Sequence, residues 1–170
     1  MAQPKIQHIE EGFAAFDVAL ARLRGEVETA CEGERGWPER VAAVIRACFA
    51  FAAEDPWAAR LLTVEALSGD EKSQLRYEAM VTHFAGLLRS GRALELCNPD
   101  LPAITESAMA GGVAMLIGRR LEAGREEELP AIAADTVEFV LIPYVGIEEA
   151  RRLAREHRSG AMPPPAVPGA

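Results

Sequence analysis

The chain has 170 residues, of which 49% are hydrophobic and 26% charged, so it is long enough to form one globular domain with a substantial core. Its formal net charge of -8 argues against binding of a nucleic-acid backbone over a broad surface. The odd number of cysteines and the lack of a CxxC motif or a membrane-spanning or signal-like segment indicate a cytoplasmic protein with reduced thiols.

Apolar residues recur at helical spacing, beginning with a first helix expected over 6–31. Its stripe repeats every seven residues, as in Phe13, Leu20 and Val27, and favours a long helix packed on a bundle. A second helix begins at Trp37 and Pro38. It ends at Asp55, which is also a plausible N-cap for a third helix over 56–68.

Ser68 and Glu71 have the spacing of a capping box at the start of a fourth helix, which runs to about Ser90. After a loop, a fifth helix is expected over 102–123, a sixth from 129, and a short basic helix over 147–158. The pattern predicts an all-α antiparallel bundle of about six long helices plus the short C-terminal helix. Residues 1–158 are expected to form a single domain and 159–170 a disordered proline-rich tail.

The stretch from Ser107 to Gly118 carries no charge and is apolar on both sides of the expected helix. Its small residues share one narrow face: Ser107, Gly111, Ala114 and Gly118. The opposite face carries larger residues: Met109, Val113 and Leu116. We expect the larger residues to face the chain's own core and the small face to pack against a second copy of the chain, so that Gly111→Leu weakens a homodimer.

Motifs that carry chemistry are absent from the sequence. The three histidines, His8, His83 and His157, have no partner at metal-ligand spacing, and there is no nucleophile elbow or phosphate loop. The basic run over 151–158 is read as a solvated terminal helix rather than a nucleic-acid site. We therefore expect no enzyme activity, no metal and no cofactor.

The middle helices supply large apolar side chains that suit either an ordinary core or a ligand pocket: Phe49, Trp57, Leu61, Tyr77, Met80, Phe84 and Met109. Three polar groups at the margins of these faces favour a pocket: Glu65, His83 and the Tyr77 hydroxyl. Glu65 with His83 is also the one pair that a helical enzyme with dispersed catalytic residues would use.

Four segments, in this order and spacing, resemble the C-terminal domain of TetR-family transcriptional regulators: GFAAFDVALARL, WPERVAAVIRACFAFAAEDPWAARLLTVEAL, AMAGGVAMLIGRRLEAGREEELP and VEFVLIPYVGIEEAR. The resemblance covers Phe13 to Arg152. It implies a helical domain that binds a small, largely apolar effector and dimerises through its last two long helices. In such regulators, effector binding changes the separation of two DNA-reading heads.

Carried onto this chain, the resemblance implies a cavity that includes Val113 together with the pocket residues named above. It implies a dimer interface of Ser107, Gly111, Ala114, Gly118, Phe139, Val140, Pro143 and Tyr144. The family's helix-turn-helix domain does not fit in the residues ahead of Phe13, so we expect no direct DNA binding by this chain. The main alternative is a helical association module without a ligand, which a cavity among Trp57, Tyr77 and Met109 would argue against.

Overall fold

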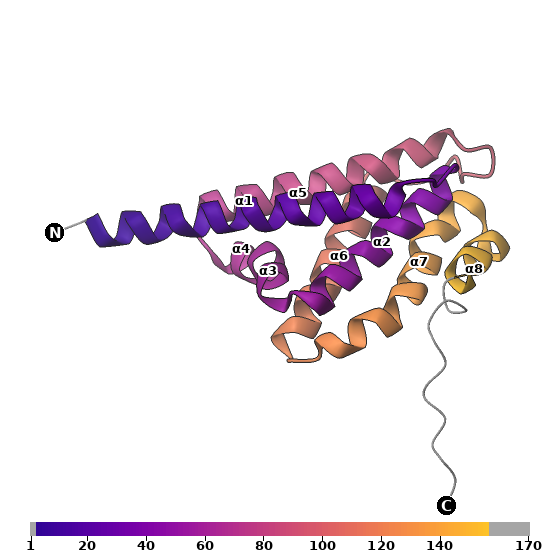
Figure 1. Ribbon diagram of the computed structural model, residues 1–170. Coiled ribbons are helices and arrows are strands. Elements are labelled where there is room, and N and C mark those ends of the chain that lie inside the picture. The colour runs from indigo at the N-terminus through magenta and orange to yellow at the C-terminus, as the bar shows by residue number, and fades with distance from the viewer. Residues whose placement is uncertain (1–2, 157–170) are drawn as a thin grey trace, which may run out of the picture.

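The computed structural model describes the backbone of residues 3–156 and the side chains from residue 12 onward. It is an all-helical bundle, and no strand occurs between residues 3 and 156 (Figure 1). The predicted fold class is therefore confirmed. The proline-rich tail expected over 159–170 lies outside the described residues. Within residues 3–156, no helix has both the length and the apolarity that a bilayer crossing needs.

The first two helices, α1 (Gln3–Cys31) and α2 (Trp37–Glu54), pack against each other. The buried side of α1 is formed by Phe16, Ala19, Leu23 and Val27, which repeat at helical spacing. Its N-terminal part projects beyond the other helices (Figure 1). The helix is therefore anchored to the bundle by its C-terminal half.

The chain is continuously helical from Pro56 to Ser68, where a π-helical segment interrupts an α-helix. This stretch comprises α3 (Pro56–Arg60), the π-helical segment η1 (Leu61–Glu65) and α4 (Ala66–Ser68). As predicted, Asp55 caps its start, because a carboxylate oxygen accepts a hydrogen bond from the backbone N–H of Ala58 at 3.0 Å. Among the described residues, this is the one π-helical segment.

The next helix, α5 (Glu71–Arg89), continues into the short 3-10 segment η2 (Ser90–Ala93). The predicted capping box was wrong. Asp70 is the N-cap and accepts from the N–H of Ser73 at 2.9 Å. Ser68 belongs to the last turn of the preceding run, where its hydroxyl donates to the Val64 carbonyl instead.

The remaining helices are α6 (Thr105–Glu122), η3 (Glu126–Glu128), α7 (Leu129–Val145) and α8 (Ile147–Arg155). Gly124 and Gly146 follow α6 and α7 with positive φ, which glycine adopts without strain, so the chain can turn sharply there. Helix α7 is central, because it packs against both α2 and α8 and fully buries Val137 and Leu141.

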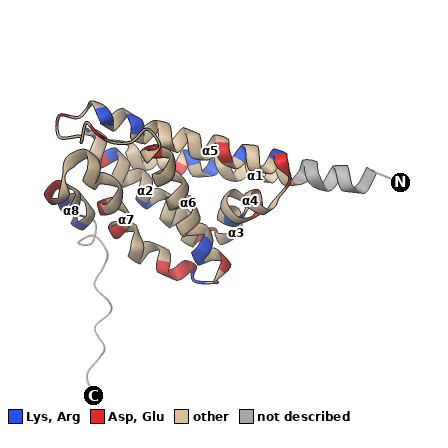
Figure 2. Cartoon of the chain, turned by 180° about the vertical axis from the view of Figure 1, so that it is seen from behind, with Lys and Arg blue, Asp and Glu red and all other residues tan. Residues whose placement is uncertain are grey.

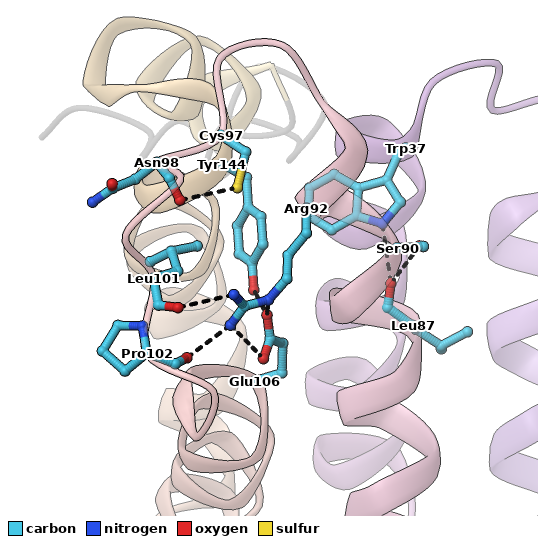
Figure 3. Close-up of polar contacts among 10 residues, drawn as sticks. All are labelled: Trp37, Leu87, Ser90, Arg92, Cys97, Asn98, Leu101, Pro102, Glu106 and Tyr144. Carbon is cyan, nitrogen blue, oxygen red and sulfur yellow. Dashed lines mark hydrogen bonds and ion pairs between the residues drawn. The ribbon is translucent and has the colours of Figure 1, made fainter.

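One buried ionic cluster fixes the start of α6 (Figure 3). The Glu106 carboxylate is fully buried and accepts hydrogen bonds from Arg92 Nε at 2.5 Å and Nη2 at 3.0 Å. Arg92 also donates to the carbonyls of Leu101 and Pro102, and the Tyr144 hydroxyl donates to Glu106 at 3.3 Å. The cluster thus ties η2, the loop before α6, and α7 together.

The cluster also sets the protonation of its members. The hydrogen bond from Arg92 holds the pKa of Glu106 below its usual range, so the carboxylate stays charged. Burial, and then the negative charge of Glu106, raise the pKa of Tyr144, so its hydroxyl stays a proton donor. The buried charge therefore has a cation and a neutral donor as partners.

Candidate ligand cavity and outer helix face

An apolar cavity of about 100 Å³ lies in the core between α1, α2, the π-helical segment, α5, α6 and α7. It is larger than the space that a single water molecule needs and smaller than engineered cavities that bind benzene. Its lining is formed by Leu23, Val41, Val44, Ile45, Cys48, Phe51, Ala52, Ala59, Leu62, Thr63, Met80, Val81, Phe84, Leu87, Leu88, Ala110, Val113, Ala114, Ile117 and Val140.

Two lining side chains carry polar atoms, and both are neutral. The Thr63 hydroxyl already donates to the Ala59 carbonyl at 2.7 Å. Burial, reinforced by the nearby Cys31, raises the pKa of the Cys48 thiol to about 12, so it is not a thiolate at neutral pH. A charge or an unsatisfied polar group would be costly here, so the cavity suits an uncharged apolar group.

Three of the predicted pocket residues line this cavity: Met80, Phe84 and Val113. Phe49 and Met109 are buried and Tyr77 is half-buried, but all three pack elsewhere in or against the core. Trp57 is 62% exposed, and the cavity does not lie among Trp57, Tyr77 and Met109, where one was expected. The small residues Ala58 and Ala59 are the part of α3 that faces the core, so Trp57 and Leu61 turn away from it.

Glu65 and His83 lie in different grooves. Glu65 lines a surface groove of about 290 Å³ with Leu61, Phe13 and Arg76. His83 lines a separate groove farther along the same side of α5 and contacts Phe84 edge-on, with ring centroids 5.7 Å apart. The pair that an enzyme hypothesis needs is therefore not brought together. Among the residues described, no group of three His, Cys, Asp or Glu side chains is placed to hold a metal ion.

The groove that contains His83, here called the outer groove, has a volume of about 620 Å³ and lies between the C-terminal half of α1, the start of α2, and α5. It is lined by Arg24, Val27, Glu28, Cys31, Trp37, Arg40, Val41, Val44, His83, Phe84, Leu87 and Ser90. The residues of α1 and α2 that line this groove were not predicted from the sequence. The feature that could have indicated them is a pair of arginines, Arg24 and Arg40, on helices whose other sides are apolar.

A second candidate surface is apolar and exposed. The outer α6–α7 face consists of Ile104, Ala108, Gly112, Met115, Phe139 and Ile142. Its three most exposed large residues are Ile104 at 70%, Phe139 at 63% and Met115 at 59%. A shallow groove of about 270 Å³ runs between the two helices beside Gly112 and Phe139. Most of α6 and α7 is free of charged residues (Figure 2).

This face differs from the one predicted on α6. Ser107 is exposed and Gly111 half-buried, but Ala114 lines the cavity and Gly118 is buried. A Cβ atom on Gly118 would lie 3.5 Å from Thr63, so this glycine allows close packing of α6 on the π-helical segment. The helix is turned by about one residue position, roughly 100°, from the predicted orientation.

The same correction applies to α7. Phe139 is exposed as predicted and Pro143 is half-buried, whereas Val140 and Tyr144 are buried within their own chain. Val140 lines the apolar cavity and Tyr144 bonds to Glu106. Both helices therefore contribute to the cavity with one side and to the outer α6–α7 face with the other.

These features define a helical bundle with an apolar cavity and, within the described residues, an exposed apolar face on its last two long helices. No family model, curated protein or solved structure matches the chain.

Proposed function

We propose that the chain is the effector-binding and dimerisation domain of a TetR-like transcriptional regulator that senses a small, largely apolar molecule in the cytoplasm. One observation carries the proposal. Helix α6 lines the apolar cavity through Ala110, Val113 and Ala114, and its opposite side, with Gly112 and Met115, belongs to the outer α6–α7 face. In the proposal, the ligand site and the association surface therefore share one helix.

This arrangement supports coupling between ligand binding and assembly geometry. A ligand changes a conformational equilibrium only through its different affinity for the two states. In the cavity it would contact Ala110 and Val113 on α6 and Leu23 on α1. A shift of α1 relative to α6 would then change where the projecting N-terminal part of α1 lies relative to the partner chain. In the proposal, this chain itself does not bind DNA.

The outer α6–α7 face supports a homodimer. Exposed side chains as large as Met115 and Phe139, on adjacent helices, favour burial because apolar surface removed from water stabilises by about 25 cal/mol per Å². A stable interface covers roughly 800 Å² on each partner. The two helices and the groove between them present a continuous surface on which such an interface would form.

The dimer is tested by light scattering on the purified chain, whose protomer mass is 18.3 kDa. We expect twice that mass for the unmutated protein and a shift to monomer for Met115→Glu and Phe139→Glu. Leu75→Glu is the matched control, because Leu75 is 57% exposed on α5, away from the outer α6–α7 face. A monomeric unmutated chain at high protein concentration would rule out the dimer.

The cavity is smaller than those that bind benzene, so it is tested by thermal unfolding in the presence of 1-butanol, whose short alkyl chain is narrower than a ring. A ligand that binds only the folded state raises the melting temperature by mass action. The cavity-filling substitution Ala110→Phe should abolish the shift, whereas Ala79→Phe on the exposed side of α5 should keep it. A dimer that shows no shift with 1-butanol or with longer apolar molecules would favour an association module without a ligand.

A further inference from the structure

The apolar cavity and the outer groove share a wall. Four side chains line both spaces: Val41 and Val44 from α2, and Phe84 and Leu87 from α5. Of these, Phe84 is half-buried and Leu87 is 39% exposed, so this part of the wall is the least tightly packed. The cavity therefore adjoins the groove at Phe84 and Leu87.

The groove side of this wall carries positive charge. Arg24 on α1 and Arg40 on α2 are both exposed, and no carboxylate within the described part of the chain lies in ion-pair distance of either. Glu28 is the acidic residue in the lining, and His83 is the other titratable group on the α5 side. The lining therefore carries two guanidinium groups and one carboxylate in a protein of net charge -8, and Glu34 places a second carboxylate near Cys31 at the edge of the groove.

We propose that the ligand is an amphiphilic carboxylate whose apolar tail enters the cavity past Phe84 and Leu87 and whose head remains beside Arg24 and Arg40. This inference rests on the proposed function, since it names the class of molecule that the cavity takes. A cavity lining without a charge requires that the head stay outside. A single negative charge fits the groove, because Glu28 offsets part of the charge of the two arginines.

The volumes set the length of the tail. A cavity of about 100 Å³ is smaller than the cavity of roughly 150 Å³ that takes a whole benzene ring, so it suits the end of an alkyl chain. The outer groove, of about 620 Å³, takes the following carbons and the head. Medium-chain carboxylates are therefore preferred to short acids, which cannot span both spaces.

The experiment compares three probes that share a tail and differ in the head: octanoate, 1-octanol and octylammonium. Isothermal titration calorimetry on the full chain at low salt should show octanoate binding about tenfold more tightly than 1-octanol, with octylammonium weakest. Added salt should weaken octanoate binding and leave 1-octanol unchanged, since exposed charges are screened. Acetate, which has the same head and no tail, should not bind.

Variants separate the head site from the tail site. Arg24→Gln and Arg40→Gln should remove the preference for octanoate and keep 1-octanol binding, whereas Arg89→Gln, exposed on α5 outside the groove, should change neither. Ala110→Phe should weaken both octanoate and 1-octanol. Val113→Phe repeats this test from another position in the cavity lining if the first variant does not fold by circular dichroism.

The outcomes distinguish this inference from the proposed function. Equal affinities for octanoate and 1-octanol, unchanged by Arg24→Gln and Arg40→Gln, would overturn the carboxylate head and leave an apolar effector in place. Failure of all three probes and of 1-butanol to bind the folded chain would overturn the ligand-binding function itself.

Discussion

Replacing Gly91 by alanine tests the packing that closes one end of the outer groove. The added methyl group would lie 2.5 Å from Cη2 and 2.8 Å from Cε2 of Trp37, well inside van der Waals contact. The indole cannot retreat easily, because its N–H donates to the Leu87 carbonyl at 3.0 Å and its ring packs 4.9 Å from that of Tyr144. We therefore expect the protein to lose stability.

Two opposing effects set the magnitude. Overpacking a filled site costs about 1–3 kcal/mol. Alanine at a position with negative φ gains about 0.4–1 kcal/mol, because it restricts the unfolded chain. The clash is larger, so Gly91→Ala should destabilise by about 1–2 kcal/mol. For a chain of this size that lowers the melting temperature by roughly 2–8 °C.

Gly86→Ala is the matched control, because a Cβ atom there meets nothing within 4 Å and the residue lies inside α5. It should stabilise by about 0.5–1 kcal/mol, the difference in helix preference between glycine and alanine. Thermal unfolding followed by far-UV circular dichroism measures both variants under identical conditions. If Gly91→Ala raised the melting temperature as much as Gly86→Ala, the close contact between Trp37 and Gly91 would be refuted.

Three further outcomes follow from described contacts. Glu106→Gln should destabilise the fold at neutral pH. Because the folded pKa of Glu106 is lowered, the difference from the unmutated chain should shrink as pH falls below about 4 toward that pKa, as measured by urea titration. Gly118→Ala should be tolerated, since its Cβ makes ordinary contacts with Thr63, whereas Gly118→Leu should lower the melting temperature. Cys48, with a pKa near 12, should be alkylated last among the three thiols at pH values near 8, as read by mass spectrometry.

The helix boundaries were largely predictable because they depend on local chemistry. The expected ends of α2, at Trp37 and just before Asp55, agree with the structure, since Pro38 suits the first turn of a helix and Asp55 caps the next one. The start of α5 was misassigned because Ser68 and Asp70 both suit an N-cap. The choice between them depends on where the preceding helix ends, which the pattern did not reveal.

The orientation of α6 and α7 could not be derived in the same way. Between Ser107 and Gly118 every residue is small or apolar, so hydrophobic periodicity does not identify one buried side. The orientation is decided by close packing of Gly118 on Thr63, between helices that are far apart in the sequence. Two of the pocket residues that were identified, Met80 and Phe84, lie on a side of α5 where the apolar pattern was unambiguous. Val113 lies inside the ambiguous stretch, and it was identified because it shares a face with the larger residues there.

The buried charge at Glu106 gave no signal in the sequence. A glutamate at the start of a helix is normally read as a surface residue that complements the helix dipole. Its burial requires Arg92, fourteen residues earlier, and two loop carbonyls, none of which forms a recognisable motif.

The π-helical segment Leu61–Glu65 gives the chain one residue more than an α-helix would need over the same distance. Arg60, just before it, donates to the carbonyl of Leu121 at 2.5 Å, and Ala66, just after it, is buried. With this additional residue, the spacing between Arg60 and Ala66 no longer fits the period of a regular α-helix. The π-helical winding compensates for it, so both residues keep their contacts. The π-helical segment therefore absorbs one additional residue between α3 and α4. Deleting one residue from it should convert Pro56–Ser68 into an uninterrupted α-helix that keeps both flanking contacts.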